Sequence, residues 1–490
     1  MVNFPPEIWL NVALFVCDNE LRNLLGVNSV FFDIAINLRW KDVDLMTRNT
    51  SQAMHVLSRL SDPFIGNRLR SLTLRLTHVK QRSPRLDNAN VGHPHQQFYS
   101  TFRRVFKVLR RDTQGPGSSV SSSPKFSEVM DALIACSPNF CNIQQLRIDS
   151  WDLPPSYDIQ PLFKSFWSSF GSNLHQLSLG GNLEGYKLLI ETDPILPSLI
   201  DLQVEFTNNV FRVDQDTDAA TLVDIVAPFI NRLSHHIKFL KKWSWAALDL
   251  SDFFLRLTAF PRVERLSVRM AFNIAFQQNA SGLKTLLSAS SGSLQRLDLR
   301  LNPSGWPINP IREESLGQWL SSCVADDKCF SHLHALDIYP TIIPVSLDVL
   351  LTFIERSSST LKELLVRDRY LQQTEARNVI DAASQCPNLV SLRFNLMRLD
   401  IGLLDHLARK LPNLTHLWIA LEEVLSNREV GGLGHAFFED LKGRSYPHWK
   451  LRDISIWQGG QEIEHDAMLA FARNIPSVTS LFLRGHMRSL

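Results

Sequence analysis

Two stretches in the C-terminal half, CPNLVSLRF at residues 386–394 and LPNLTHLWI at residues 411–419, share one pattern that decides the fold. After the Pro, three apolar residues stand in the order apolar-x-x-apolar-x-apolar, and the x positions are mostly polar. The last two apolar residues are two positions apart, so their side chains point to the same side of a strand. Each stretch therefore predicts a half-buried strand.

The same six-residue pattern recurs along most of the chain, which indicates an internal repeat. Its copies begin at Leu69, Ile143, Leu174, Leu199, Val263, Leu294, Leu333, Leu361, Leu389, Leu414, Leu451 and Val478. A weaker thirteenth copy, WAALDL, begins at Trp245. Most neighbouring copies lie about 25 to 39 residues apart, which matches or slightly exceeds the roughly 20–29 residues of leucine-rich repeats.

A helix-like stretch and a Pro come before several copies of the repeat. Examples are ARNVIDAASQ before Pro387 and LLDHLARK before Pro412. Proline stops a helix because it lacks an N–H group and disfavours the α conformation in the residue before it. Each unit is therefore predicted to be a strand, a loop, a helix and a turn marked by Pro. Two copies also end in Asn182 and Asn302, whose amides can bond the backbone of the turn that leaves the strand.

Such a unit can bury its apolar face only against its neighbours. The predicted fold class is therefore α/β, with a horseshoe solenoid over residues 69–490, a parallel sheet on its concave face and helices on its convex face. An ordinary α/β domain is the alternative, but a doubly wound sheet rarely supplies twelve strands with one shared pattern.

The first 45 residues do not follow the repeat. They read FPPEIWLNVALFV and then DNELRNLLGVNSVFFDIAINLRW, with apolar residues at helical spacing. We expect three short helices here, followed by a connecting helix and cap over residues 46–68. Some forty residues cannot bury enough surface to be stable alone, so part of their apolar surface is expected to be covered by something else.

This segment resembles the F-box. The residues that carry the resemblance are Phe4, Pro5, Glu7 and Ile8, then Val27, Phe31, Ile34 and Ala35, and finally Leu38 and Trp40. Two departures are Phe4, where Leu is usual, and Val30, where a basic residue is common. Degenerate leucine-rich repeats like those at residues 69–485 follow an F-box in fungal and other eukaryotic proteins, so both parts of the chain resemble that family.

The resemblance implies that residues 1–45 dock on the Skp-type adaptor of a cullin–RING ubiquitin ligase, with the solenoid holding a target protein. The residues expected to bind the adaptor are Phe4, Pro5, Ile8, Leu21, Leu24, Val27, Phe31 and Trp40. Two alternatives stay open: helices that only cap the first repeat, and a leucine-rich protein-binding scaffold without a ligase role.

Composition narrows the choice of partner and compartment. The formal charge of +2, from 51 basic and 49 acidic residues in 490, gives no broad basic field for nucleic acid. Six scattered cysteines are typical of a reducing compartment. No apolar run approaches the roughly 18 residues of a membrane span, and the N-terminus lacks the basic start of a signal peptide. We expect a cytoplasmic or nuclear protein.

No motif indicates catalysis. The sequence has no G-x-S-x-G elbow, no H-E-x-x-H helix and no kinase signature set, so no catalytic residue, cofactor or metal ligand is expected. One amphipathic basic stretch covers residues 95–111 and is more simply a convex helix than a membrane-binding one. A low-complexity segment, about 112–124, is predicted to be an inserted mobile loop.

We expect the target to bind the concave strands. The residue between the last two apolar positions of a copy, and the residue just after them, should project from that face. In the C-terminal half this set combines Arg and aromatic residues of the kind enriched in interface hot spots. Its members are Asp298, Arg300, Arg367, Arg393, Trp418, Trp457, Phe482 and Arg484. Loops that fold back over the concavity would cover these residues, and the sequence leaves this alternative open.

Overall fold

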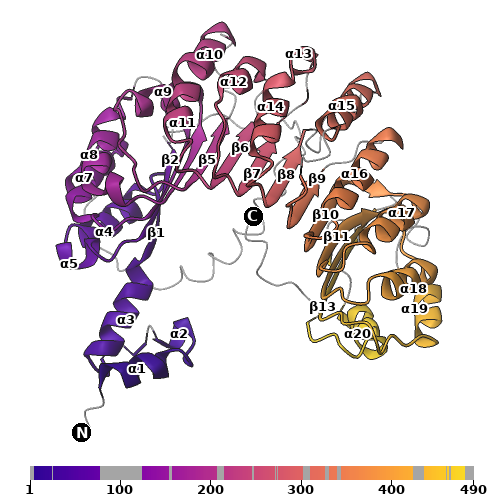
Figure 1. Ribbon diagram of the computed structural model, residues 1–490. Coiled ribbons are helices and arrows are strands. Elements are labelled where there is room, and N and C mark those ends of the chain that lie inside the picture. Colours follow the sequence, from indigo (N-terminus) through magenta and orange to yellow (C-terminus); the bar gives the residue numbers. More distant parts are fainter. Residues whose placement is uncertain are drawn as a thin grey trace, which may run out of the picture.

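In the part of the chain that the computed structural model describes, fourteen strands lie side by side in one sheet, in the order in which they occur along the chain. The structure describes residues 5–21, 23–24, 26–77, 124–153, 157–206, 215–244, 248–270, 272, 274–301, 310–325, 330–338, 344–422, 435–458, 461–462 and 465–480. The sheet bends into an arch with strands along its inner side and helices along its outer side (Figure 1). The predicted α/β horseshoe is therefore confirmed.

The strands from β1 to β13 pair in parallel, and β14 turns back antiparallel on β13. Their bounds are β1 Asp42–Met46, β2 Ser71–Thr77, β3 Gln145–Asp152, β4 Gln176–Gly181, β5 Asp201–Phe206, β6 Phe239–Ser244, β7 Arg265–Arg269, β8 Arg296–Arg300, β9 Ala335–Ile338, β10 Glu363–Leu371, β11 Ser391–Leu396, β12 His416–Leu421, β13 Asp453–Gln458 and β14 Gln461–Glu462.

The repeat fixes where the strands begin. In each copy from Leu69 to Leu451, apart from the weak one at Trp245, the strand begins two residues after the first apolar residue. The middle apolar residues of adjacent copies then lie opposite one another, as Leu392, Leu417 and Ile454 do. In the copy at Val478 the described part reaches Ser480, which forms a parallel bridge to Asp453. A shared pattern therefore gives a shared register.

Two strands differ from the prediction. The weak copy from Trp245 is not a strand where it is described, at Leu248 to Leu250. The strand at this place is β6, in which Lys242 occupies the last apolar position of the pattern. The sheet also begins at β1, before residue 69, because WKDVDL at residues 40–45 is itself a copy of the repeat.

Helices connect the strands along the outer side of the arch (Figure 1). They are α4 Thr50–Leu60, α5 Pro63–Gly66, α7 Phe126–Cys136, α8 Gln160–Phe170, α9 Leu183–Ile190, α10 Gln215–Thr221, the π-helical turn Leu222–Val226, α11 Ala227–Arg232, α12 Ser251–Arg256, α13 Ile274–Gln278, α14 Ser281–Ser290, α15 Pro310–Cys323, α16 Pro344–Arg356, α17 Gln373–Ala383, α18 Ile401–Lys410, α19 His435–Lys442 and α20 His465–Asn474. Short 3₁₀ turns cover Ser137–Asn139 and Gly171–Asn173.

Polar side chains set where several of these helices begin. The Asn182 side chain accepts a hydrogen bond from the backbone N–H of Gly185 and so caps α9. This N–H group lies in the first turn, where it has no partner within the helix. Asp400 does the same for α18 through the N–H of Leu403. The predicted role of Asn182 in the turn after its strand is confirmed, whereas Asn302 lies outside the described residues.

One apolar core runs along the whole arch between the sheet and the helices. Leucines of the repeat supply most of it. In the middle of the arch, aromatic rings continue from β5 across α12 to α13, with centroids 5.4–6.2 Å apart at Phe206, Phe253, Phe254 and Phe276. Each unit is thus joined to the next by burial, as expected for a solenoid.

Three helices precede the sheet: α1 Pro6–Ala13, α2 Asp18–Leu21 and α3 Ser29–Trp40. They project from the N-terminal end of the arch, and α3 leads directly into β1 (Figure 1). The predicted basic helix at residues 95–111 lies outside the described residues, and so does the predicted loop at 112–124 except for Pro124.

Candidate functional site

Exposed apolar side chains gather on the three N-terminal helices. No residue of α1 is buried. Seven of the twelve large apolar residues that are exposed in the described part of the chain lie between residues 8 and 32. They are Ile8, Leu10, Val12, Leu14, Phe15, Val27 and Phe32, which we call the N-terminal apolar patch. Exposed large apolar side chains concentrated in one short segment are a feature of interaction surfaces.

The residues expected to bind an adaptor fall into three groups. Ile8 and Val27 are exposed, at 46% and 55% of their surface, and Pro5 is exposed just before α1. Leu24 and Trp40 are half-buried, and Trp40 packs against the core of the solenoid. Leu21 and Phe31 are buried inside the chain, and Phe4 lies outside the described residues.

One of the two buried members, Phe31, joins two of the helices. Phe31 meets Trp9 edge to face, with ring centroids 5.4 Å apart, so α1 is anchored on α3. This contact turns the opposite side of α1 outward. Five members of the patch were absent from the predicted set, namely Leu10, Val12, Leu14, Phe15 and Phe32. For four of them, all but Phe32, the run IWLNVALFV was the available signal: it is apolar except for Asn11, and a single helix cannot bury every side of such a run against one neighbour.

A cluster of side chains joins α3 to the start of the solenoid. Arg68 forms an ion pair with Asp33 at 2.8 Å and donates to the Asn37 side chain at 2.7 Å. Its guanidinium group also lies 4.3 Å from the ring of Phe64, which stacks against Phe32. These contacts set the orientation of the helical segment relative to the first repeat.

The concave strands bring part of the predicted target-binding set together. The Arg393 guanidinium group on β11 lies 3.7 Å from the ring centre of Trp418 on β12. Trp418 in turn lies 6.2 Å from Trp457 on β13, and the Trp457 indole donates to the Ser455 hydroxyl at 2.9 Å. The three large side chains are half-buried and form a row across three strands at the C-terminal end of the arch.

Other members of that set do not join the row. Asp298 is buried and forms an ion pair with Arg269 at 2.8 Å, so it lies in the middle of the arch. Arg300 is half-buried on the same strand. The side chain of Arg367 lies outside the described residues, as do the whole of Phe482 and Arg484.

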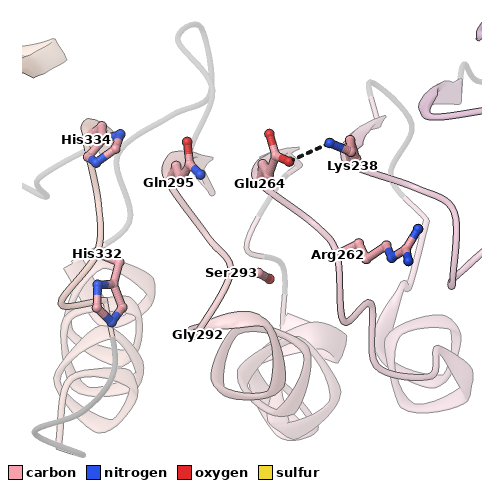
Figure 2. A pocket seen from close by; sticks show the side chains of 8 residues that line it. All are labelled: Lys238, Arg262, Glu264, Gly292, Ser293, Gln295, His332 and His334. Carbon is pink, nitrogen blue, oxygen red and sulfur yellow. Dashed lines mark hydrogen bonds and ion pairs between the residues drawn. The ribbon is translucent and has the colours of Figure 1, made fainter.

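A wide groove of about 570 Å³ runs along the edge of the sheet where the strands begin. Its lining residues are Lys238, Arg262, Glu264, Gly292, Ser293, Gln295, His332 and His334 (Figure 2). Lys238, Glu264, Gln295 and His334 each precede a strand by one residue. The Lys238–Glu264 pair, at 2.9 Å, joins two of them, whereas Figure 2 shows the two His rings standing apart from that pair. Among the described residues that line the groove, no nucleophile is oriented by a base in the way that covalent catalysis requires.

In the described ranges, no three His, Cys, Asp or Glu side chains gather as a metal site would require. None of the helices described here is both long enough and apolar enough to cross a membrane.

Comparison with known proteins adds little to this geometry. No family model matches the chain, and no curated protein matches it. Among solved structures, an internalin from Listeria monocytogenes is similar over 58% of this chain and 69% of its own, at 15% identity and a TM-score of 0.27. A likeness this weak carries no argument, so the solenoid assignment rests on the strand pairing itself.

Proposed function

We propose that the protein is the substrate-receptor subunit of a Skp–cullin–F-box ubiquitin ligase. Its N-terminal helices dock on the Skp-type adaptor, and its solenoid binds the target protein. The observation that carries the proposal is the N-terminal apolar patch, which occupies the segment whose residues resemble an F-box. Apolar surface of this extent on three short helices is stabilised when a partner covers it.

In this proposal the chain itself does not catalyse the transfer of ubiquitin. It raises the effective concentration of the target near the ubiquitin-carrying enzyme, because both are held in one assembly. The Arg68 cluster supports the role, since a defined orientation between docking helices and solenoid keeps a bound target in one place. The proposed place of action is the cytoplasm or the nucleus.

A protein-binding scaffold without a ligase role is the second candidate. The row of Arg393, Trp418 and Trp457 favours protein binding by the concave face, independently of whether α1 to α3 bind an adaptor. In that case α1 to α3 are a cap on the first repeat. The exposed members of the patch separate the two candidates, because a cap has no need of an outward apolar face.

Co-purification with a Skp-type adaptor tests the proposal. We expect the full chain to retain the adaptor and the double variant Pro5→Ala, Ile8→Asp to lose it, because an unpaired carboxylate at an apolar interface costs several kcal/mol. Leu255→Asp is the matched control, since Leu255 on α12 is exposed to 47% and Ile8 to 46%. Undiminished binding by a folded double variant would refute the F-box assignment.

A further inference from the structure

The groove at the edge of the sheet is built by the turns that lead into strands β6 to β9. In each turn the first apolar residue of the repeat is buried in the core. These residues are Ile237, Val263, Leu294 and Leu333, each at most 1% exposed. The residues on either side of them are polar and line the groove instead.

The lining side chains stand in two rows (Figure 2). One row precedes the strands by one residue and consists of Lys238, Glu264, Gln295 and His334. The other precedes them by three residues and consists of Arg262, Ser293 and His332. The groove volume of about 570 Å³ falls within the roughly 300–1,000 Å³ of ligand sites, but such sites are mostly apolar. A polar lining favours a polar segment of another polypeptide.

The backbone along this edge is already paired. The carbonyl oxygen of Lys238 accepts hydrogen bonds from the N–H groups of Glu264 and Arg265, at 2.8 and 3.0 Å. The carbonyl oxygen of Glu264 accepts in the same way from Gln295 and Arg296. These bonds hold the turns in a fixed order and leave recognition of a ligand to the side chains.

The side chains of the groove offer more positive charge and N–H donors than they use among themselves. Glu264 is the acidic residue among the described lining residues, and the Lys238 ammonium group pairs with it at 2.9 Å. Arg262 and His332 are exposed, and His334 is half-buried. None of these three side chains has a hydrogen bond or ion pair with another residue in the described part of the chain.

We propose that this groove binds an acidic segment of the target polypeptide. A carboxylate only accepts hydrogen bonds and a guanidinium group only donates them, so Arg262 and the His rings match a run of Asp or Glu side chains. Arg262 and His332 belong to turns two strands apart, about 10 Å at the usual strand spacing, which about three residues of extended chain cover. The inference rests on the proposed function only in taking the occupant to be part of a target protein.

The test uses the full-length protein and the fluorescein-labelled peptide Gly-Glu-Glu-Glu-Glu-Gly, with a matched peptide that carries Gln in place of each Glu. Fluorescence anisotropy measures binding. We expect saturable binding of the Glu peptide and about tenfold weaker binding of the Gln peptide, because neutral amides lose the charge-assisted hydrogen bonds.

Three variants locate the binding. Arg262→Ala should weaken binding of the Glu peptide about fivefold, as the loss of one exposed ion pair does. Glu264→Gln should instead tighten binding about threefold, because it removes the carboxylate of the groove and leaves Lys238 to the peptide. Damage to the fold would not produce such a gain. The control is Arg452→Ala, since Arg452 is exposed and precedes β13 by one residue, at the same edge but outside the groove; it should bind as the unaltered chain does.

Four results would overturn the proposal. They are the absence of saturable binding, equal binding of the Gln peptide, weaker binding by Glu264→Gln, and equal losses in Arg262→Ala and Arg452→Ala. Tighter binding of a five-nucleotide single-stranded RNA than of the Glu peptide would also overturn it, because the groove would then be a general polyanion surface. Adaptor binding is measured on the same variants and should not change, so failure of the groove proposal and failure of the F-box proposal remain distinguishable.

Discussion

Lys242 occupies a position that the repeat otherwise fills with an apolar residue. Its side chain is 2% exposed, and its ammonium nitrogen lies 3.6 Å from the ring centre of Phe206 and 5.9 Å from that of Phe253. It donates to the backbone carbonyl of Trp243 at 3.1 Å. Burial holds the pKa of Lys242 well below its usual value, so folding favours the neutral amine.

The substitution Lys242→Met should therefore stabilise the protein by about 1–3 kcal/mol at neutral pH. An apolar side chain of similar length has no charge that must be desolvated or neutralised on burial. The folded pKa lies below the unfolded one, so the unfolded chain binds more protons between the two values and wild-type stability rises with pH through that window. The advantage of the variant should thus shrink towards pH 10.5. Thermal unfolding of both proteins at a series of pH values measures this difference in stability. A variant less stable than wild type at every pH would contradict the conclusion that burial of Lys242 is destabilising.

Arg393 and Trp418 are the residues on which target capture is expected to depend. The double variant Arg393→Ala, Trp418→Ala should lose bound targets while keeping the adaptor, since each hot spot contributes about 2 kcal/mol. The control is Arg147→Ala on β3, a half-exposed arginine of the same face whose partner is Asp149. Proximity labelling compares the three chains. Unchanged targets in the double variant would place the binding surface elsewhere.

At the scale of whole elements, α12 and α14 approach each other at a glycine. A Cβ atom on Gly282 would lie 2.4 Å from the backbone nitrogen of Leu255 and 2.6 Å from the carbonyl carbon of Phe254. Both are backbone atoms, so neither can move aside as a flexible side chain would. The close packing of these two helices therefore depends on the absence of a side chain at this position.

Gly282→Ala should destabilise the protein by about 1–3 kcal/mol, as overpacking of a tight interior does. Gly317→Ala is the matched control, because Gly317 also lies in a helix, α15, and its Cβ would meet nothing within 4 Å. The control should be neutral or slightly stabilising, since alanine favours a helix over glycine by up to about 1 kcal/mol. Urea unfolding of both variants gives the comparison; equal stabilities would show that the helices can separate at no cost.

Most of the elements follow from the repeat pattern, and the exceptions have physical reasons. The strands β2 to β5 and β7 to β13 begin where the sequence predicts. The strand β6 was missed because a lysine can fill an apolar position when aromatic rings surround it. The strand β1 was missed because Trp40, the first apolar residue of its copy, was assigned to the end of the F-box resemblance.

The candidate sites were less predictable, because they depend on contacts between repeats. Alternation along β8 places Asp298 on the concave face, yet the alternation does not predict its ion pair with Arg269 on the neighbouring strand. The exposure of Leu14 and Phe15, at 80% and 91%, depends on how α1 lies on α3. Sequence periodicity specifies which side of an element is apolar, and it leaves open what covers that side.

On the scale of the whole molecule, the arch separates two surfaces. The N-terminal apolar patch lies at one end, and the aromatic and arginine row of β11 to β13 lies towards the other (Figure 1). Parallel strands connect the two ends, with register shifts only at Arg75–Thr77 and Val366–Tyr370 among the described pairs, so the repeats between them act as a spacer. A receptor that presents a target to an enzyme bound elsewhere needs such a separation.

Hydrogen–deuterium exchange of the full chain, with and without a purified Skp-type adaptor, tests the central claim most directly. We predict that the adaptor slows exchange at backbone amides of residues 7–15 and 26–32 and leaves the strands β2 to β13 unchanged, because binding covers the N-terminal apolar patch alone. Protection confined to the solenoid, or no protection at adaptor concentrations that saturate another F-box protein, would contradict the claim.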